Sequence, residues 1–84
     1  MTGTVWDKVL GRIETKVNKY SYYTWFRDTS LLEDDGGTLA IRVPNPLVVD
    51  WLTKHYASVL NEALAEVGRA GVALRFNPDT QEMP

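Results

Sequence analysis

The spacing of apolar residues changes three times along this chain, and that alternation limits the folds it can adopt. Apolar residues recur at helical spacing over residues 5–17 and 18–28, and then alternate with polar ones over 31–33 and 38–43. Helical spacing returns over residues 46–67, and alternation returns over 72–76. The sequence therefore predicts an α+β domain with the order α-α-β-β-α-β, in which helices pack on a three-stranded sheet.

Capping signals support these boundaries. Asn18 and Asn45 are good N-caps for the second and third helices. Gly68 and Gly71 form a GxxG sequence, which in KH nucleic-acid domains joins two helices. Here the sequence lies between a helix and a strand, so we interpret it as a helix C-cap.

The composition narrows the classes of function. The chain has no cysteine and one histidine, His55, so we expect no disulfide, no thiolate nucleophile, no metal site and no enzyme activity. No phosphate-binding loop occurs, and we expect no cofactor in this domain. The net charge of -2 argues against strong binding to nucleic-acid phosphates. No apolar run approaches the roughly 18 residues of a membrane span, so a cytoplasmic location is predicted.

The third helix carries more apolar bulk than one buried face can use. At about 100° per residue, one side of this helix collects a core stripe. Its members are Val48, Leu52, Tyr56, Val59, Leu60, Ala63 and Val67. Leu47 and Trp51 lie roughly 100–150° away from that stripe. Trp51 could fold over the first helix or the sheet edge as core, or form a contact patch with Leu47, which is the better candidate for a partner contact.

Aromatic residues of the first two helices can likewise be interpreted either as structural residues or as contacts for a partner. Trp6 belongs by angle to the core stripe of the first helix, but its place in the first turn also allows self-association. Tyr20, Tyr23 and Arg27 share a face of the second helix that is not its core face. That face is either a solvated surface or a platform for stacking a base or gripping a partner.

Several residues also occur in an order and spacing typical of one family. They are Trp6; Tyr22 with Trp25-Phe26-Arg27; Pro44-Asn45 with Leu47 and Asp50-Trp51; Tyr56; and Leu74-Arg75-Phe76. Through them the chain resembles domain I, the N-terminal domain of the bacterial chromosomal replication initiator DnaA, over roughly residues 5–76.

The resemblance implies a KH-like α+β fold and an interaction domain rather than an enzyme. Domains of this family mediate initiator self-association at the origin, recruit the replicative helicase, dock regulatory proteins and contact single-stranded DNA weakly. We expect residues 1–77 to form this domain and residues 78–84 to begin a flexible linker. In the complete initiator, the resemblance places ATP binding in an AAA+ domain and origin recognition in a helix-turn-helix domain, both beyond this domain.

The resemblance also assigns residues. Trp6 matches a self-association position, and Leu47 matches an apolar position that contacts the helicase. Ser21 stands where some members carry an acidic residue for helicase and DNA contact, and Asp50 and Trp51 complete the predicted helicase or regulator site. Two other classes remain as alternatives, a free-standing KH-like module that binds single-stranded nucleic acid and a small enzyme.

Overall fold

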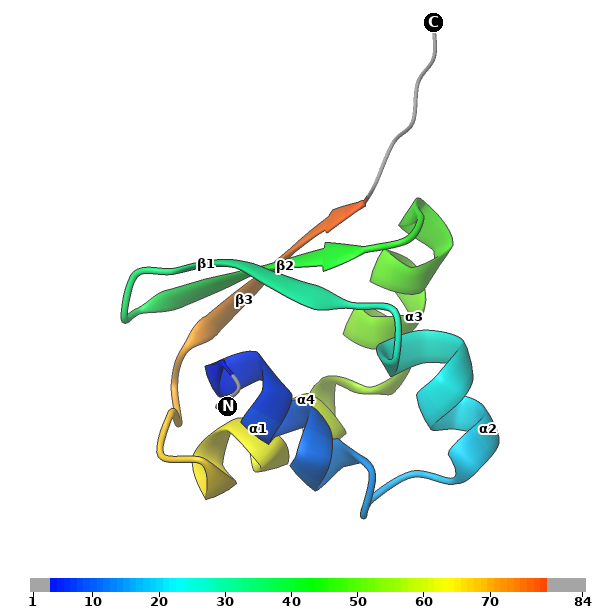
Figure 1. The fold of residues 1–84 in the computed structure, drawn as a ribbon, viewed down its shortest axis with the longest axis horizontal. Helices are drawn as coiled ribbons and strands as arrows, with labels where there is room; N and C mark the ends of the chain where they lie inside the picture. The colour runs from blue at the N-terminus through cyan, green and yellow to red at the C-terminus, as the bar shows by residue number, and fades with distance from the viewer. Residues whose placement is uncertain (1–3, 79–84) are drawn as a thin grey trace, which may run out of the picture.

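The computed structural model describes residues 4–78, in which helices lie along one side of a small sheet (Figure 1). The elements in chain order are α1 (Val5–Ile13), α2 (Lys19–Ser21), η1 (Tyr22–Phe26), β1 (Ser30–Asp34), β2 (Thr38–Val43), α3 (Pro46–His55), α4 (Ala57–Glu66) and β3 (Ala73–Pro78). The predicted α+β order is confirmed, with the second and third helices each divided into two segments.

The sheet is mixed, with the strand order β1-β2-β3. Strands β1 and β2 are antiparallel, and the register between them shifts between Leu31 and Glu33, which leaves Leu32 as a bulge. Strands β2 and β3 are parallel and pair residue by residue without a shift, from Thr38 with Ala73 to Val43 with Pro78. The sheet therefore has one bulged edge and one regular edge.

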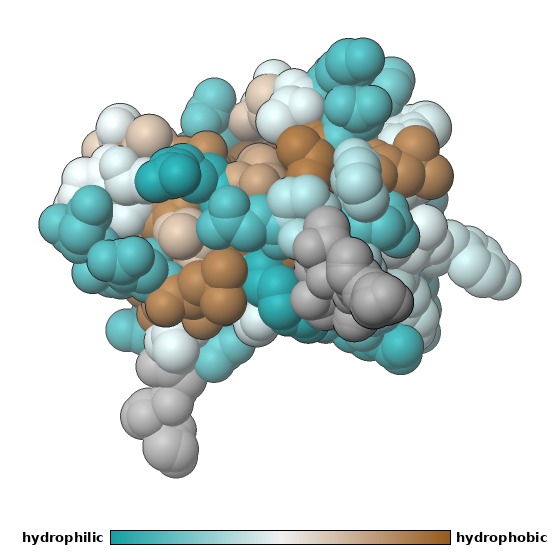
Figure 2. All heavy atoms as spheres, turned by 90° about the horizontal axis from the view of Figure 1, so that it is seen from above, coloured by the Kyte–Doolittle hydropathy of each residue, from teal (hydrophilic) through white to brown (hydrophobic). Residues whose placement is uncertain are grey.

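The core forms between the helices and one face of β2. Leu39, Ile41 and Val43 are fully buried on that face. The buried residues that the helices contribute are Trp6, Val9, Leu10, Ile13, Phe26, Val48, Leu52, Leu60, Ala63 and Leu64. The opposite side of β2 is half-buried, and the molecule seen from the sheet side shows apolar groups separated by polar ones (Figure 2).

The helix predicted over residues 46–67 is interrupted, and this is a correction. Tyr56 has a non-helical backbone (φ -121°, ψ 13°) and separates α3 from α4. Its ring packs edge-on against Phe26, with centroids 5.2 Å apart. The bend turns a different side of α4 toward the core than a straight helix would. Leu64 is therefore buried although it lies outside the predicted core stripe, whereas Val67, a member of that stripe, is only partly buried.

The first two helices also differ from the prediction. The capping box of Thr4 and Asp7 is present, but α1 ends at Ile13, well before residue 17. Asn18 caps the second helix as predicted, because its side chain accepts a hydrogen bond from the Ser21 N–H. After that single turn the chain widens into the π-helical segment η1 instead of continuing as a regular α-helix.

Strand β3 runs one residue past the boundary predicted for the domain. Pro78, assigned above to the linker, belongs to β3 and pairs with Val43. Residues 79–84 of the predicted linker lie outside the described residues. Gly68 follows the C-cap of α4 with φ +82°, which confirms the C-cap interpretation of the GxxG sequence.

Ion pairs tie the ends of the elements together. Arg69, in the connection from α4 to β3, donates to both carboxylate oxygens of Asp34 in β1, at 3.1 and 2.5 Å. These bonds, with that from the Gly36 N–H, lower the pKa of Asp34 from its ordinary value of 3.8. Lys16, in the turn after α1, similarly pairs with Glu62 and Glu66 of α4, at 3.3 and 2.6 Å, and these contacts raise the pKa of Lys16.

We predict that Asp34→Asn lowers the melting temperature at pH 7 by a few degrees. Because folding lowers the pKa of Asp34, its stabilising contribution is complete above pH 3.8 and is lost as the pH falls through the lower, folded-state pKa. The gap between wild type and variant should therefore close in acid. Thermal unfolding followed by circular dichroism from pH 7 down to about pH 2 measures it.

Glu33→Gln is the matched control, since it removes a neighbouring exposed carboxylate on the same strand. Its melting temperature should stay close to wild type throughout. A gap for Asp34→Asn that persists unchanged into acid would contradict an effect of the Asp34 charge.

Candidate interaction surface

Aromatic side chains join η1 to α3 at one end of the molecule. The rings of Trp25 and Trp51 stack, with centroids 4.8 Å apart and planes 21° from parallel. The ring of His55 lies 4.1 Å from that of Trp51. In Figure 1 the second helix and α3 lie at the same end, away from the β1–β2 turn. We call Leu47, Asp50, Trp51 and His55 of α3, with Trp25 of η1, the docking face.

The start of α3 explains why Leu47 is exposed. The Asn45 side chain accepts a hydrogen bond from the Val48 N–H at 3.2 Å, and Pro46 occupies the first turn. Val48 and Leu52 are buried and fix the orientation of the helix. Leu47 consequently points away from the core and is 58% exposed, one turn before Trp51.

The π-helical segment η1 positions its aromatic residues on two sides. The Arg27 N–H donates to the Tyr22 carbonyl at 3.0 Å, a bond across five residues. Phe26 is fully buried, whereas Trp25 is half-buried and faces Trp51. Burial also raises the pKa of the Tyr22 phenol above 10.0, with a smaller contribution from the carboxylates of Glu14 and Asp7.

A second exposed group lies along α2 and η1 and ends at Arg27, the residue after η1. Tyr20 is 84% and Tyr23 53% exposed, and the Arg27 guanidinium lies 5.3 Å from the centroid of the Tyr23 ring. This distance is within the range of a cation–π contact. We call these three residues the tyrosine platform. The structure thus brings two of its three predicted members into contact.

Of the other predicted contacts, Asp50 and Trp51 belong to the docking face, whereas Ser21 lies on α2. Asp50 is exposed on α3, one turn after Leu47. Ser21 is half-buried on α2, where its backbone N–H donates a hydrogen bond to the side-chain oxygen of Asn18. Trp51 is half-buried against Trp25 of the second helical segment rather than over α1 or the sheet edge. The roles of these residues in partner binding stay predictions.

Trp6 lies in the core, which decides between the two interpretations given above, a core residue and an exposed self-association contact. Its side chain is 1% exposed, and its indole N–H donates to the Thr29 hydroxyl oxygen at 2.9 Å. The Thr29 hydroxyl in turn donates to the Phe26 carbonyl at 2.6 Å. This chain of bonds holds α1 against the end of η1. The indole of Trp6 is therefore not part of the surface described here.

Trp25 and His55 are members of the docking face that the sequence analysis did not identify. By helical spacing Trp25 shares the inward face of the second helix with Tyr22 and Phe26, and His55 falls on a mostly polar flank of the third, so neither is predicted as a contact. The available signal for His55 is spacing, because Leu47, Trp51 and His55 follow one another at intervals of four and share one side of α3.

Among residues 4–78, no three His, Cys, Asp or Glu side chains are grouped so that they could hold a metal ion. No helix within the same residues is both long and apolar enough to cross a membrane.

Comparison with known proteins identifies the family. The sequence model described as the DnaA N-terminal domain matches residues 3–66. The fold is similar to a chain in the crystal structure of a HobA–DnaA (domain I–II) complex from Helicobacter pylori, with a TM-score of 0.72 and 16% sequence identity. That similarity covers 92% of this chain and 100% of the other. This chain belongs to the family of DnaA N-terminal domains.

We predict that Trp6→Ala lowers the free energy of unfolding by about 3–5 kcal/mol, because it removes a fully buried indole. Thr29→Val, which leaves the indole N–H without its acceptor, should cost about 1–3 kcal/mol. Urea denaturation followed by circular dichroism measures both values.

Leu47→Ala serves as the control and should change the free energy of unfolding by less than about 0.5 kcal/mol, since Leu47 is exposed. Near-wild-type stability of Trp6→Ala would contradict the core position of Trp6.

Proposed function

We propose that this DnaA N-terminal domain is a protein-interaction domain of a chromosomal replication initiator, and that its docking face binds the replicative helicase or a regulatory protein. The observation that carries the proposal is the exposure of Leu47 beside the stacked Trp25 and Trp51. Aromatic side chains are enriched in the buried centres of protein interfaces, and Leu47 would add apolar surface beside the two rings.

The docking face has the composition that such a contact needs. Leu47 is 58% exposed, so burying the rest of its side chain against a partner would contribute about 1–2 kcal/mol. The ring stack limits the movement of Trp51, so little conformational entropy is lost when a partner covers it. Asp50 and His55 border these apolar groups and can provide directional polar contacts at the rim.

The Helicobacter pylori structure supports a role in binding another protein. It contains HobA in a complex with DnaA (domain I–II), and a chain of that complex has the fold seen here. A domain with this arrangement of helices therefore occurs in complex with another protein. We extend that kind of role to this chain through its family membership.

Self-association at the origin is proposed from the family resemblance. The burial of Trp6 limits how this residue can contribute. We assign Trp6 the role of holding α1 in place through its bond to Thr29, while the exposed α1 residues Asp7, Lys8 and Gly11 would meet another copy.

Weak contact with single-stranded DNA is a second proposed role, and the tyrosine platform favours it. Exposed aromatic rings stack on bases of any sequence, and Arg27 can contact a phosphate or a base. The net charge of -2 provides little general attraction for phosphates, which fits a weak and local contact rather than a free-standing nucleic-acid-binding module.

We predict that Leu47→Ala weakens binding to the N-terminal domain of the cognate replicative helicase about tenfold, since a buried interface anchor is lost. An amide NMR titration gives both the affinity and the residues that shift. The shifts should cluster at Leu47, Asp50 and the second helix. The control is Leu32→Ala on β1, because Leu32 is 55% exposed and Leu47 58%.

The control variant should bind the helicase domain as the wild type does. Equal losses for Leu47→Ala and Leu32→Ala would indicate nonspecific apolar association. If a saturating amount of helicase domain moves no signal on the docking face, the helicase proposal fails, and a regulator becomes the proposed partner.

For single-stranded DNA, we predict that Tyr23→Ala weakens binding of a fluorescent oligo-dT at least about fivefold, because one stacking surface is lost. Arg27→Ala should weaken it as well, whereas Arg75→Ala, an equal change of charge at an exposed position of β3, should not. Anisotropy titrations at several salt concentrations measure these affinities. Equal effects of the two arginine substitutions would indicate general electrostatic attraction instead of a platform.

A further inference from the structure

The two edges of the sheet differ in how well they resist pairing with another strand. The β1 edge is interrupted by the bulge at Leu32, and the acidic residues Glu33 and Asp34 follow it. Bulges and charges are the usual devices that prevent another strand from pairing with an edge. Strand β3 pairs with β2 over its whole length without a register shift and carries one charged residue, Arg75. The β3 edge therefore remains a regular template.

The backbone groups on that open edge can be identified. The Ala73 N–H donates to the Gly37 carbonyl, on the β2 side, at 3.0 Å. Because backbone groups alternate in direction along a strand, those of Leu74 and Phe76 point away from β2. Pro78 has the same direction and lacks an N–H, as expected for proline at a free edge. Within residues 4–78, no hydrogen bond joins Leu74 or Phe76 to backbone outside the sheet.

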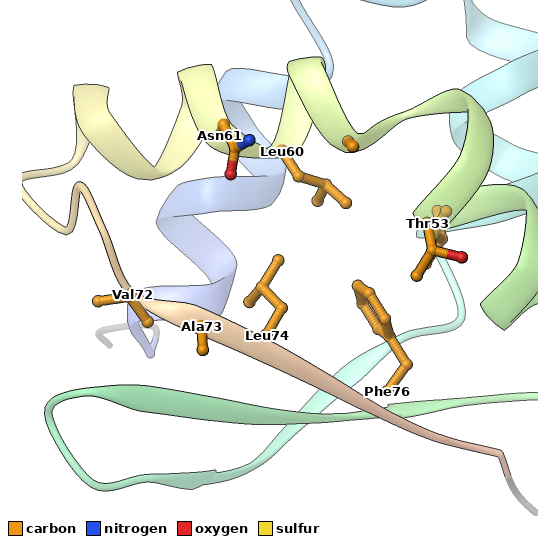
Figure 3. A pocket seen from close by; sticks show the side chains of 9 residues that line it. Thr53, Leu60, Asn61, Val72, Ala73, Leu74 and Phe76 are labelled. Atoms are coloured by element: carbon orange, nitrogen blue, oxygen red, sulfur yellow. The ribbon is translucent and has the colours of Figure 1, made fainter.

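A pocket lies beside this edge. It has a volume of about 250 Å³ and lies between β3 and the bend that joins α3 to α4. Figure 3 shows Leu74 and Phe76 pointing from β3 toward the helices, and Leu60 pointing toward them from α4. The other lining residues are Leu52, Thr53, Ala57, Asn61, Val72 and Ala73. The lining contains no charged side chain.

We propose that the β3 edge and this pocket bind an extended peptide segment of a partner protein. The segment would add to the sheet as a fourth strand, next to β3, and place one apolar side chain in the pocket. This surface includes none of the docking-face residues. The inference therefore goes beyond the proposed function and can fail independently of it.

Two features favour an extended peptide over other occupants. The outward backbone groups of Leu74 and Phe76 are spaced to match another extended main chain, the arrangement of β-strand addition. The pocket is smaller than the roughly 300–1,000 Å³ typical of small-molecule sites and suits a single side chain. Its uncharged lining offers no cation to a phosphate, so a nucleic acid is less suited to it.

An amide NMR titration of the whole chain with a synthetic peptide tests the proposal. The probe is a capped octapeptide in which leucine and threonine alternate, with a lysine at each end. We expect shifts at Leu74, Phe76, Thr53 and Asn61, and slower hydrogen exchange at the Leu74 and Phe76 amides. The same peptide with alternate backbone nitrogens methylated should bind about tenfold more weakly, because it cannot donate to β3.

Matched variants test the pocket itself. Asn61→Trp places a large ring at the pocket and should weaken binding of the alternating peptide about tenfold. Ser58→Trp adds the same ring on the same helix, at an exposed position that does not line the pocket, and should bind like the wild type. Both substitutions are at exposed positions, so the variants can be compared as folded proteins.

Four results would overturn the proposal. They are an absence of shifts at saturating peptide, shifts confined to the docking face, equal binding of the methylated peptide, and equal or stronger shifts of the β3 amides by oligo-dT. A change of the Leu74 and Phe76 signals with protein concentration alone, abolished by Asn61→Trp, would assign the edge to a second copy of this chain instead.

Discussion

The bend at Tyr56 is the constraint on which the rest of the structure depends. A straight helix over residues 46–66 would be about 30 Å long, whereas a strand of six residues, such as β2, extends only about 20 Å. Such a helix would run past the sheet and leave part of its apolar surface uncovered. With the bend, α3 packs near η1 and β3 while α4 packs on α1. The same bend forms the wall of the pocket beside β3.

Much of the fold follows from local signals in the sequence. The alternation in β2, the N-caps at Asn18 and Asn45 and the glycine after α4 were each predicted, because each depends on neighbouring residues alone. The bend was not predicted, since neither proline nor glycine occurs at Tyr56 or beside it. Its ring packs against Phe26, thirty positions earlier in the chain, and helical periodicity carries no information about that contact.

In the candidate surface, too, some positions follow from the local sequence and others depend on tertiary contacts. The exposure of Leu47 follows from its angle on α3 relative to the buried Val48 and Leu52. The position of Trp6 could not be decided by angle, because a first-turn side chain is buried only if another element covers it. In the structure Trp6 is buried, and the Thr29 hydroxyl just after η1 is the acceptor for its indole N–H. Likewise, stacking of Trp25 on Trp51 requires η1 and α3 to lie side by side, which is a property of the tertiary structure.

The parallel pairing of β2 with β3 has a consequence for the order in which the domain folds. The β1–β2 hairpin needs only a short turn, whereas β3 reaches β2 only after α3 and α4 have crossed the sheet. Closing so long a loop is slow compared with forming a hairpin. On the ribosome, the hairpin and the helices emerge before β3, so Leu39 and Ile41 remain incompletely covered until the last strand arrives. Among the described strands, β3 is therefore the last to join the sheet during synthesis.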